Sequence, residues 1–373
     1  MINNNPNLLS LKKTLMHKSN KKVVNKKKTL STKSYFLFCG FLGVLLFGAI
    51  LFSFCIGRFS KLNITDVPLI LLRQIIPTLT KTWSEADEGV VINLRLPRII
   101  TAVIVGASLS VSGVSYQALF SNPVASSDTL GVTSSSAFGA IFGILLNFNT
   151  IGTKAISFCI GCIAVMCVFL LASRLSKGRN LTLYLILIGM VISSLFQALL
   201  SVLKYVADPV DQLPKITYWL MGSFSNVKLN DIPFCILSFL IGSVPLFLLR
   251  WRQNLLSLSD YEVKSLGENI SILRLVTVIC ATLLTSSAVA MTGGISWVGL
   301  VIPHITRLIV GYDSRRLLPA SALMGALFLL IMDDIARCAS VYELPISVLT
   351  SLIGAPIFFA ILIKNKERLV DGD

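Results

Sequence analysis

The sequence has few charged residues for its length. Only 14% of its 373 residues are Asp, Glu, Lys or Arg, and 54% are hydrophobic, whereas a soluble domain carries about 25% charged residues. This composition excludes an ordinary soluble domain and indicates a membrane protein. The net charge of +15 does not indicate a nucleic-acid partner, because nine lysines gather in residues 12–33 instead of covering a folded face.

Several motifs of enzymes are also missing. The sequence has no G-x-x-x-x-G-K-[ST] loop, so it cannot bind ATP through that motif. It has no His-Glu-x-x-His and no G-x-S-x-G, and His17 and His304 are its only histidines. These absences disfavour a membrane protease or another membrane enzyme, and we assign no catalytic residue.

One cysteine pair could indicate chemistry. Cys159 and Cys162 form a Cys-x-x-Cys, a spacing that occurs in metal and redox sites. The pair lies inside an apolar run without a second pair or a histidine nearby, which favours cysteine as a small buried apolar residue. We therefore expect no metal site and no cofactor.

Long apolar runs are what the sequence has instead. A helix needs about 20 apolar residues to cross a bilayer, and the eighth run here is short and follows Gly293-Gly294, so we expect it to be tilted or half-buried. Residues 64–80 are broken by Arg73-Gln74 and two prolines and predict an interfacial helix. The sequence therefore predicts an all-α polytopic membrane protein with about ten transmembrane helices. The ten runs are 35–57, 98–120, 129–148, 151–173, 181–206, 232–249, 272–293, 295–311, 317–338 and 345–363.

Three regions follow from these runs. Residues 1–34 predict a basic, disordered cytoplasmic tail, 35–364 the membrane domain, and 365–373 a cytoplasmic C-terminal tail. The run 34–57 is too long for a signal peptide and lacks a small-residue cleavage site, so we expect a retained span. Lys and Arg in the tail and in the loops SRLSKGR and GYDSRR place both termini inside.

Small residues recur at four-residue spacing in three of the runs. Close van der Waals approach holds helices together in lipid, and small side chains permit it. We expect these faces to pack helix against helix. They are Ala102, Gly106 and Ser110, then Ser135, Gly139 and Gly143, and Ser321 with Gly325.

Ionisable groups inside a span are costly unless they are paired. In the stretch MDDIAR, Asp333 and Asp334 lie four and three residues before Arg337, so either can pair with it on one helix face. A self-satisfied ion pair and a functional site both remain open here.

Long ordered motifs now carry a resemblance. RLPR…G…G…Q…NP…LGV at 95–132, the segment 293–326 and ELPISVLTSLIGAPIFFAILIK at 343–364 resemble the FecCD-type permeases of iron–siderophore and cobalamin ABC importers. The resemblance covers roughly residues 60–364. Ser135 and Ser347 depart from the family pattern, and we expect them to line the translocation path and affect substrate choice.

The resemblance implies a transport subunit without its own ATPase. It implies a homodimer or a pair with a paralogue, ATPase subunits on the cytoplasmic side, and an extracellular or periplasmic substrate-binding protein or lipoprotein. The expected cargo is a ferric siderophore, with haem and cobalamin as alternatives, imported across the cell membrane. Which chelate it is does not follow from the sequence, because selectivity is expected to lie in the binding protein.

The resemblance also gives roles to three arginines. Arg95 and Arg98 flank Pro97, which suits the first turn of a helix that starts at the outer face. In the family the matching arginines, with Arg337 as the third, face carboxylates of the binding protein. Ordinary snorkelling of the side chains to the interface is the alternative.

The resemblance also indicates which segments line the translocation path. By resemblance, the third, fifth and tenth spans line it, and residues 216–225, ITYWLMGSFS, form a short re-entrant helix beside it. Ser223 and Ser225 would then lie on the path. A plain surface loop is the alternative.

The inner loop 257–270 predicts a short helix over about 260–266. Ser259 and Glu262 form a capping box, Asp260 adds negative charge to the first turn, and Gly267 can end the helix in the left-handed conformation. By resemblance this is the coupling helix that fits a groove on the ATPase; an exposed connector is the alternative. The side chains expected to make contact are Tyr261, Val263 and Leu266.

Two other classes of function compete with an ABC permease. A secondary carrier would work alone and would be driven by an ion gradient. A membrane scaffold would transport nothing, and ATPase activity stimulated by a binding protein would exclude it.

Overall fold

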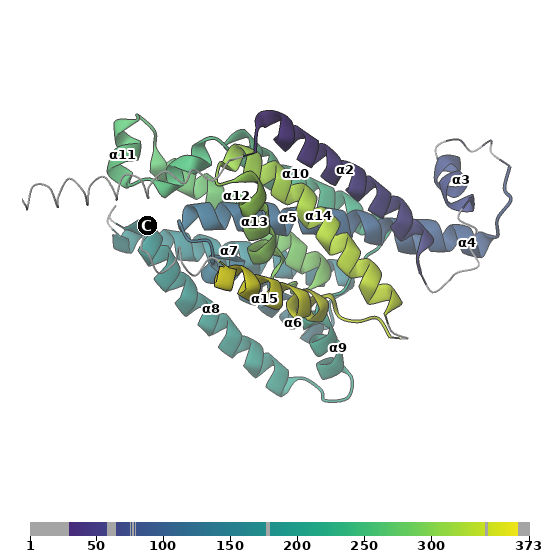
Figure 1. Cartoon of the computed structure of the whole chain (residues 1–373). Coiled ribbons are helices and arrows are strands. Elements are labelled where there is room, and N and C mark those ends of the chain that lie inside the picture. Colours follow the sequence, from purple (N-terminus) through teal and green to yellow (C-terminus); the bar gives the residue numbers. More distant parts are fainter. Residues whose placement is uncertain are drawn as a thin grey trace, which may run out of the picture.

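The computed structural model describes residues 30–57, 65–74, 76, 78, 80–176, 180–339 and 342–364. Within these residues the chain is an all-helical bundle without strands (Figure 1). Most of the predicted basic tail and the whole predicted C-terminal tail lie outside the described residues, although the first described helix already starts at Thr32.

Every predicted apolar run forms a helix, so the predicted fold class is confirmed. Among the described residues, seven helical segments are long and apolar enough to cross a membrane. These segments contain α2 (Thr32–Cys55), α5 (Leu96–Leu119), α7 (Thr150–Ser176), α8 (Leu181–Val206), α10 (Ile232–Leu248), α12 (Ile270–Thr292) and α14 (Ser314–Cys338).

Three further runs form shorter apolar helices: α6 (Val132–Leu145), α13 (Val298–Val310) and α15 (Ile346–Lys364). α13 has only 13 residues and starts directly after Trp297, which has a left-handed φ of 71°. The eighth run thus forms a helix too short to span a bilayer upright, and its expected tilted or half-buried position stays a prediction. The part of the chain that the structure describes also contains four small α-helices: α3 (Asp66–Arg73), α4 (Glu85–Gly89), α9 (Gln212–Leu220) and α11 (Asp260–Ser265).

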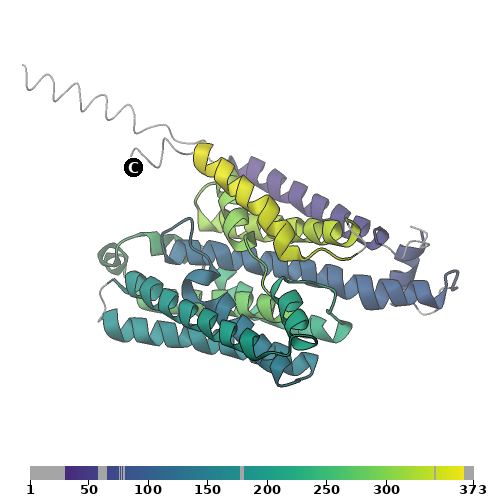
Figure 2. The same ribbon diagram turned by 90° about the horizontal axis from the view of Figure 1, so that it is seen from below.

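The core of the bundle is built around α5 and α12. Of the most apolar window of each helix, 83% is buried for the segment containing α5 and 72% for α12, against 11% for α2 and 17% for α8. Figures 1 and 2 show α2 and α8 on opposite flanks of the bundle. The outward faces of α2 and α8 are apolar, as expected for surfaces that meet lipid.

Glycines of the predicted small-residue faces lie at close helix contacts, as predicted. A Cβ atom added at Gly106 on α5 would lie 2.3 Å from the carbonyl oxygen of Gly325 on α14. A Cβ added at Gly139 on α6 would lie 2.8 Å from the carbonyl oxygen of Ile156 on α7. Only glycine permits backbones to approach this closely.

The small helices gather at the two ends of the bundle. α11 lies at one end, and α3, α4 and α9 lie towards the other (Figure 1). We call these the inner end and the outer end, after the orientation that the charge distribution predicts.

The start of the second span differs from the prediction. The helix does not begin at Pro97: α4, a π-helical segment Val90–Arg95 and α5 run on as one helical segment from Glu85 to Leu119. Ser84 caps it, with Asp87 completing a capping box. The N–H of Leu96 bonds to the carbonyl of Val91, five residues back. This π-type register leads directly into Pro97, which has no N–H to place.

Two outer segments are shorter than predicted. Only Asp66–Arg73 of the segment 64–80 is described as a helix. α9 begins earlier than the predicted re-entrant helix and ends at Leu220, because Gly222 takes a left-handed φ of 73° and turns the chain. Residues 221–225 are therefore not helical.

Candidate functional site at the outer end

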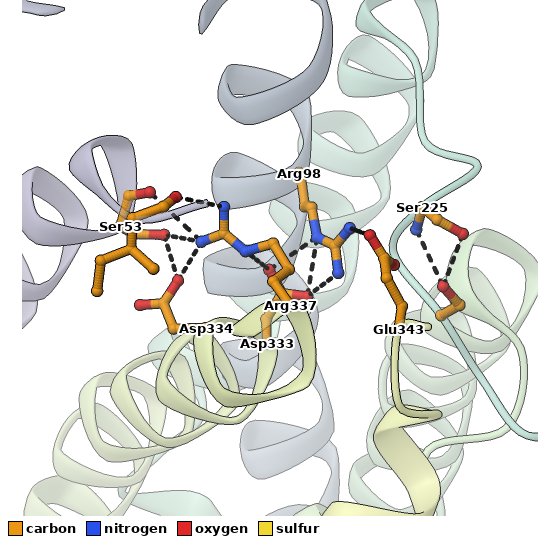
Figure 3. A network of polar contacts seen from close by, with 9 residues as sticks. Ser53, Arg98, Ser225, Asp333, Asp334, Arg337 and Glu343 are labelled. Atoms are coloured by element: carbon orange, nitrogen blue, oxygen red, sulfur yellow. Dashed lines mark hydrogen bonds and ion pairs between the residues drawn. The ribbon is translucent and has the colours of Figure 1, made fainter. Parts of the chain in front are cut away.

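A buried cluster of charged side chains joins α2, α5 and α14 at the outer end. Figure 3 shows Arg98 and Arg337 pointing towards carboxylates that come from α14 and from the segment before α15. Groups of this kind are expensive in a membrane protein unless they are paired. We therefore describe the partners of each arginine in turn.

Arg98 is held by two carboxylates. Its Nε donates to both carboxylate oxygens of Asp333 at 2.9 Å, and its Nη2 donates to Oδ1 at 2.8 Å. Its Nη1 donates to Oε1 of Glu343 at 2.8 Å. Arg98 is 7% exposed and Asp333 is fully buried. This fork-like pairing matches the planar geometry of guanidinium to carboxylate and is the strong form of such a bond.

Arg337 connects the cluster to α2. It forms ion pairs with Asp334 and, at 3.4 Å from Nε, with Asp333. Its Nη2 also donates to the hydroxyl of Ser53 at 2.6 Å, and Ser53 in turn donates to Asp334 at 2.7 Å. The predicted pairing within MDDIAR is confirmed, but it belongs to a larger network that ties three helices together.

Arg95 is buried as well. Its exposed fraction is 4%, and its Nη1 donates to the carbonyl oxygen of Phe54 at the end of α2. Arg98 and Arg337 thus pair with carboxylates of the same chain, whereas Arg95 donates to a main-chain carbonyl. The predicted contact of all three arginines with carboxylates of a binding protein stays a prediction, and in this structure their side chains are buried.

Sequence reasoning missed Glu343 and Ser53 as members of this cluster, and it paired Asp333 only with its helix neighbour. A signal was present for Glu343, because an acid opens the motif ELPIS next to a predicted span. No sequence signal identified Ser53. Its bond to Asp334 joins residues 281 positions apart and depends on how α2 crosses α14.

Main-chain hydrogen bonds join the predicted path segment to two spans. The N–H of Ser223 donates to the carbonyl of Thr292 at the end of α12, at 2.8 Å. The N–H groups of Ile346 and Ser347, at the start of α15, donate to the carbonyls of Gly222 and Met221. α9 and the loop after it are therefore fixed to the outer ends of α12 and α15.

A cavity of about 960 Å³ lies beside this junction. Ser223 and Ser225 line it together with Trp219 of α9 and with residues of the turn between α6 and α7. Ligand sites have volumes of roughly 300–1,000 Å³, so the cavity is large enough for a small molecule. The structure thus places two of the four predicted path serines at an open space.

The other two path serines lie elsewhere. Ser135 is fully buried, and its hydroxyl donates to the carbonyl oxygen of Gly131 at 2.7 Å, on its own helix. Ser347 is half-buried and donates to the hydroxyl of Ser296 at 3.3 Å. Neither is among the residues that line the large cavity.

At the inner end, α11 forms as the sequence predicts. The Ser259 hydroxyl accepts from the N–H of Glu262, and the N–H of Ser259 donates to the Glu262 carboxylate at 2.8 Å. The hydrogen bonds from Ser259 lower the pKa of the Glu262 carboxyl below its ordinary value. Gly267 has a left-handed φ of 77° and ends the helix. An ion pair of 2.7 Å between Asp260 and Arg274 ties α11 to α12.

One detail of the α11 prediction is wrong. Val263 is fully buried, in a cluster with Leu255, Leu256, Ile270 and Leu273, so it cannot contact a partner. Tyr261 and Leu266 are 82% and 62% exposed. The helix therefore uses its apolar face to fix itself to the bundle, and only Tyr261 and Leu266 remain available.

Comparison with known proteins identifies the family to which this chain is similar. Residues 45–364 match the model of the FecCD transport family. The chain is 42% identical over 320 residues to the molybdate import system permease MolB of Haemophilus influenzae, and the aligned region covers 84% of this chain and 92% of the relative. It is 36% identical over 284 residues to the hemin transport permease HmuU of Yersinia pestis, covering 74% and 84%.

A solved structure agrees in fold as well. It is described as an inward-facing conformation of a metal-chelate type ABC transporter. It superimposes with a TM-score of 0.77 and 38% identity, covering 87% of this chain and 98% of that one. The chain therefore belongs to the FecCD transport family and is a multi-pass membrane permease of an ABC importer.

Proposed function

We propose that this chain forms the translocation path for a metal chelate of the ferric-siderophore type, as a homodimer or paired with a paralogue. The observation that carries the proposal is the match to a transporter described as metal-chelate type, over almost the whole of that chain. Haem and cobalamin are alternatives, because relatives include a hemin permease and a cobalamin permease.

Molybdate is a second candidate cargo. The permease named for molybdate import shares 42% identity with this chain over 92% of its own length. A tetrahedral oxyanion and a ferric chelate differ strongly in size, so the two cargoes make different demands on the path.

ATP is hydrolysed, in this proposal, by a separate subunit that docks at the inner end. The support is α11: a capped helix fixed by the Asp260–Arg274 ion pair, with Tyr261 and Leu266 exposed. A rigid helix with exposed apolar side chains can pass a movement of the ATPase subunit on to the membrane helices, whereas a flexible loop cannot. Both termini would then lie on the cytoplasmic side.

A binding protein docks, in this proposal, at the outer end. The buried arginine cluster supports docking by fixing the outer ends of α2, α5 and α14 relative to one another. In this role Arg95, Arg98 and Arg337 hold the surface on which the partner sits.

An uptake assay tests the cargo. The permease, its ATPase and its binding protein are placed in proteoliposomes, and uptake of ferric citrate, a ferric trihydroxamate, haem, cobalamin and molybdate is compared. We expect ATP-dependent uptake of a ferric chelate. Uptake of molybdate alone would overturn the siderophore assignment and establish the second candidate, and uptake driven by an ion gradient without ATP would establish a secondary carrier.

A further inference from the structure

The cavity of about 960 Å³ lies between three elements at the outer end. It lies where the turn between α6 and α7, the helix α9 with its following loop, and the end of α12 meet. Solvent reaches part of its wall, since Ser225, Asn226 and Asn230 are exposed. A solute arriving from the outer side meets this cavity before it meets the buried core.

The charge of the lining has one sign. Lys154, Lys215 and Lys228 line the cavity, and no aspartate or glutamate is among its described lining residues. Asparagine side chains at 93, 147, 226 and 230 and hydroxyls such as Ser223 and Ser225 add hydrogen-bond donors.

The three lysines differ in how their charge is compensated. Lys154 is largely buried and pairs with Asp231 at 2.6 Å, and Lys215 is exposed and pairs with Asp211 at 2.8 Å. Lys228 is exposed and has no ion pair among the described residues. Neither of the two carboxylates lines the cavity, although Asp231 also accepts from the main-chain N–H of Lys228 at 2.9 Å. Within the described part of the chain, the ammonium group of Lys228 is therefore the charge that the cavity presents without a paired carboxylate.

The other walls strengthen this field. Phe148, Trp219 and Met291 supply apolar surface around the lysines. A concave site with charges of one sign and walls of low dielectric constant focuses the electric field and concentrates ions of opposite charge. The cavity should therefore attract anions and repel cations.

We propose that this cavity is an anion-binding vestibule that receives cargo whose negative charge is carried by oxygen atoms. An ammonium group is a compact point charge with three donors, which suits oxygen-rich anions of varied shape. A tetrahedral oxyanion and a carboxylate-rich ferric chelate share this chemistry. The inference rests on the proposed transport function and adds the charge of the cargo to it.

Charge reversal tests the vestibule. In proteoliposomes holding the complete transporter, KM for uptake is measured with molybdate, with ferric citrate and with a neutral ferric trihydroxamate. The variant Lys215→Glu with Lys228→Glu leaves the buried Lys154–Asp231 pair intact. The control, Lys204→Glu, changes an exposed lysine near the outer end of α8 that is not part of the lining.

The double variant should raise KM for at least one anionic cargo by about tenfold or more, an effect that falls with ionic strength. If KM rises for molybdate, the vestibule receives an oxyanion, and if KM rises for ferric citrate, it receives a carboxylate-rich chelate. The control should leave KM unchanged, and the double variant should leave KM for any neutral chelate that is taken up unchanged.

Three results would overturn the inference while leaving the transport function in place: an unchanged KM for the anions, uptake of the neutral chelate alone, or a rise in KM that matches a loss of affinity for the binding protein. In the last case the two lysines are docking contacts. If the wild-type transporter takes up no cargo of either charge, the proposed function fails as well.

Discussion

Removal of Arg98 distinguishes an internal ion pair from a docking contact. Arg98→Met takes away three hydrogen bonds to Asp333 and one to Glu343. Asp333 is fully buried and would keep only the longer contact to Arg337, at 3.4 Å. Breaking a buried pair by removing one partner costs about 3–5 kcal/mol, because the remaining charge is uncompensated.

The comparison is an exposed pair on the same side of the membrane. Lys215 and Asp211 lie one helical turn apart with side chains 62% and 70% exposed, and removing such a pair costs about 0.3–0.5 kcal/mol. We expect Lys215→Met to leave the free energy of unfolding nearly unchanged. The difference between the two variants should therefore be several kcal/mol.

The assay is unfolding of the permease in mixed micelles that contain increasing fractions of a denaturing detergent. The detergent fraction at which half of the permease is unfolded reports its stability. The double variant Arg98→Met with Asp333→Leu removes both charges and should recover most of the loss, because an apolar pair can replace a buried ion pair. If Arg98→Met costs less than about 1 kcal/mol but weakens binding of the binding protein, Arg98 is a docking contact and the internal role is refuted.

The remaining predictions concern packing, coupling and the path. Gly106→Ala would place a Cβ 2.3 Å from the carbonyl oxygen of Gly325, whereas ordinary contact begins at 3.4 Å, so we expect the free energy of unfolding to fall by about 1–3 kcal/mol. The control Gly48→Ala, with nothing within 4 Å of the added Cβ, should leave it unchanged, and equal effects of the two variants would contradict the packing. Gly267→Val strains the left-handed turn after α11 and should abolish stimulation of the ATPase by loaded binding protein in an assembled complex, while Gly267→Asn should keep it because asparagine tolerates this conformation; normal stimulation in the valine variant would remove the coupling role. A cysteine at Ser225, in a chain freed of its own cysteines, should react with a thiol reagent at a rate that depends on the nucleotide state; a constant rate would place Ser225 off the path.

Much of the fold follows from the sequence because the bilayer leaves few solutions. Backbone groups in lipid must bond within their own segment, so each long apolar run becomes a helix. The glycine contacts were predictable for the same reason, since Gly106 and Gly139 repeat with small neighbours at helical spacing. The capped helix α11 was predictable because its signals lie within nine residues of one another.

What the sequence did not reveal depends on contacts across the fold. The helix that reaches back to Glu85 does not follow from the apolar pattern, because its outer turns are polar. The pairing of Arg98 with Asp333 joins residues 235 positions apart and requires that α5 and α14 cross at their glycines. Val263 has the pattern of an exposed helix residue until the cluster beneath α11 is known.

The central claim is that transport through this chain is driven by a separate ATPase at the inner end. The direct test is uptake into proteoliposomes with ATP supplied only on the side of α11, measured with ionophores that remove all ion gradients. The claim predicts uptake that requires ATP hydrolysis and the binding protein and that persists without gradients. Uptake that continues without the ATPase and stops when a proton or sodium gradient is removed would contradict it.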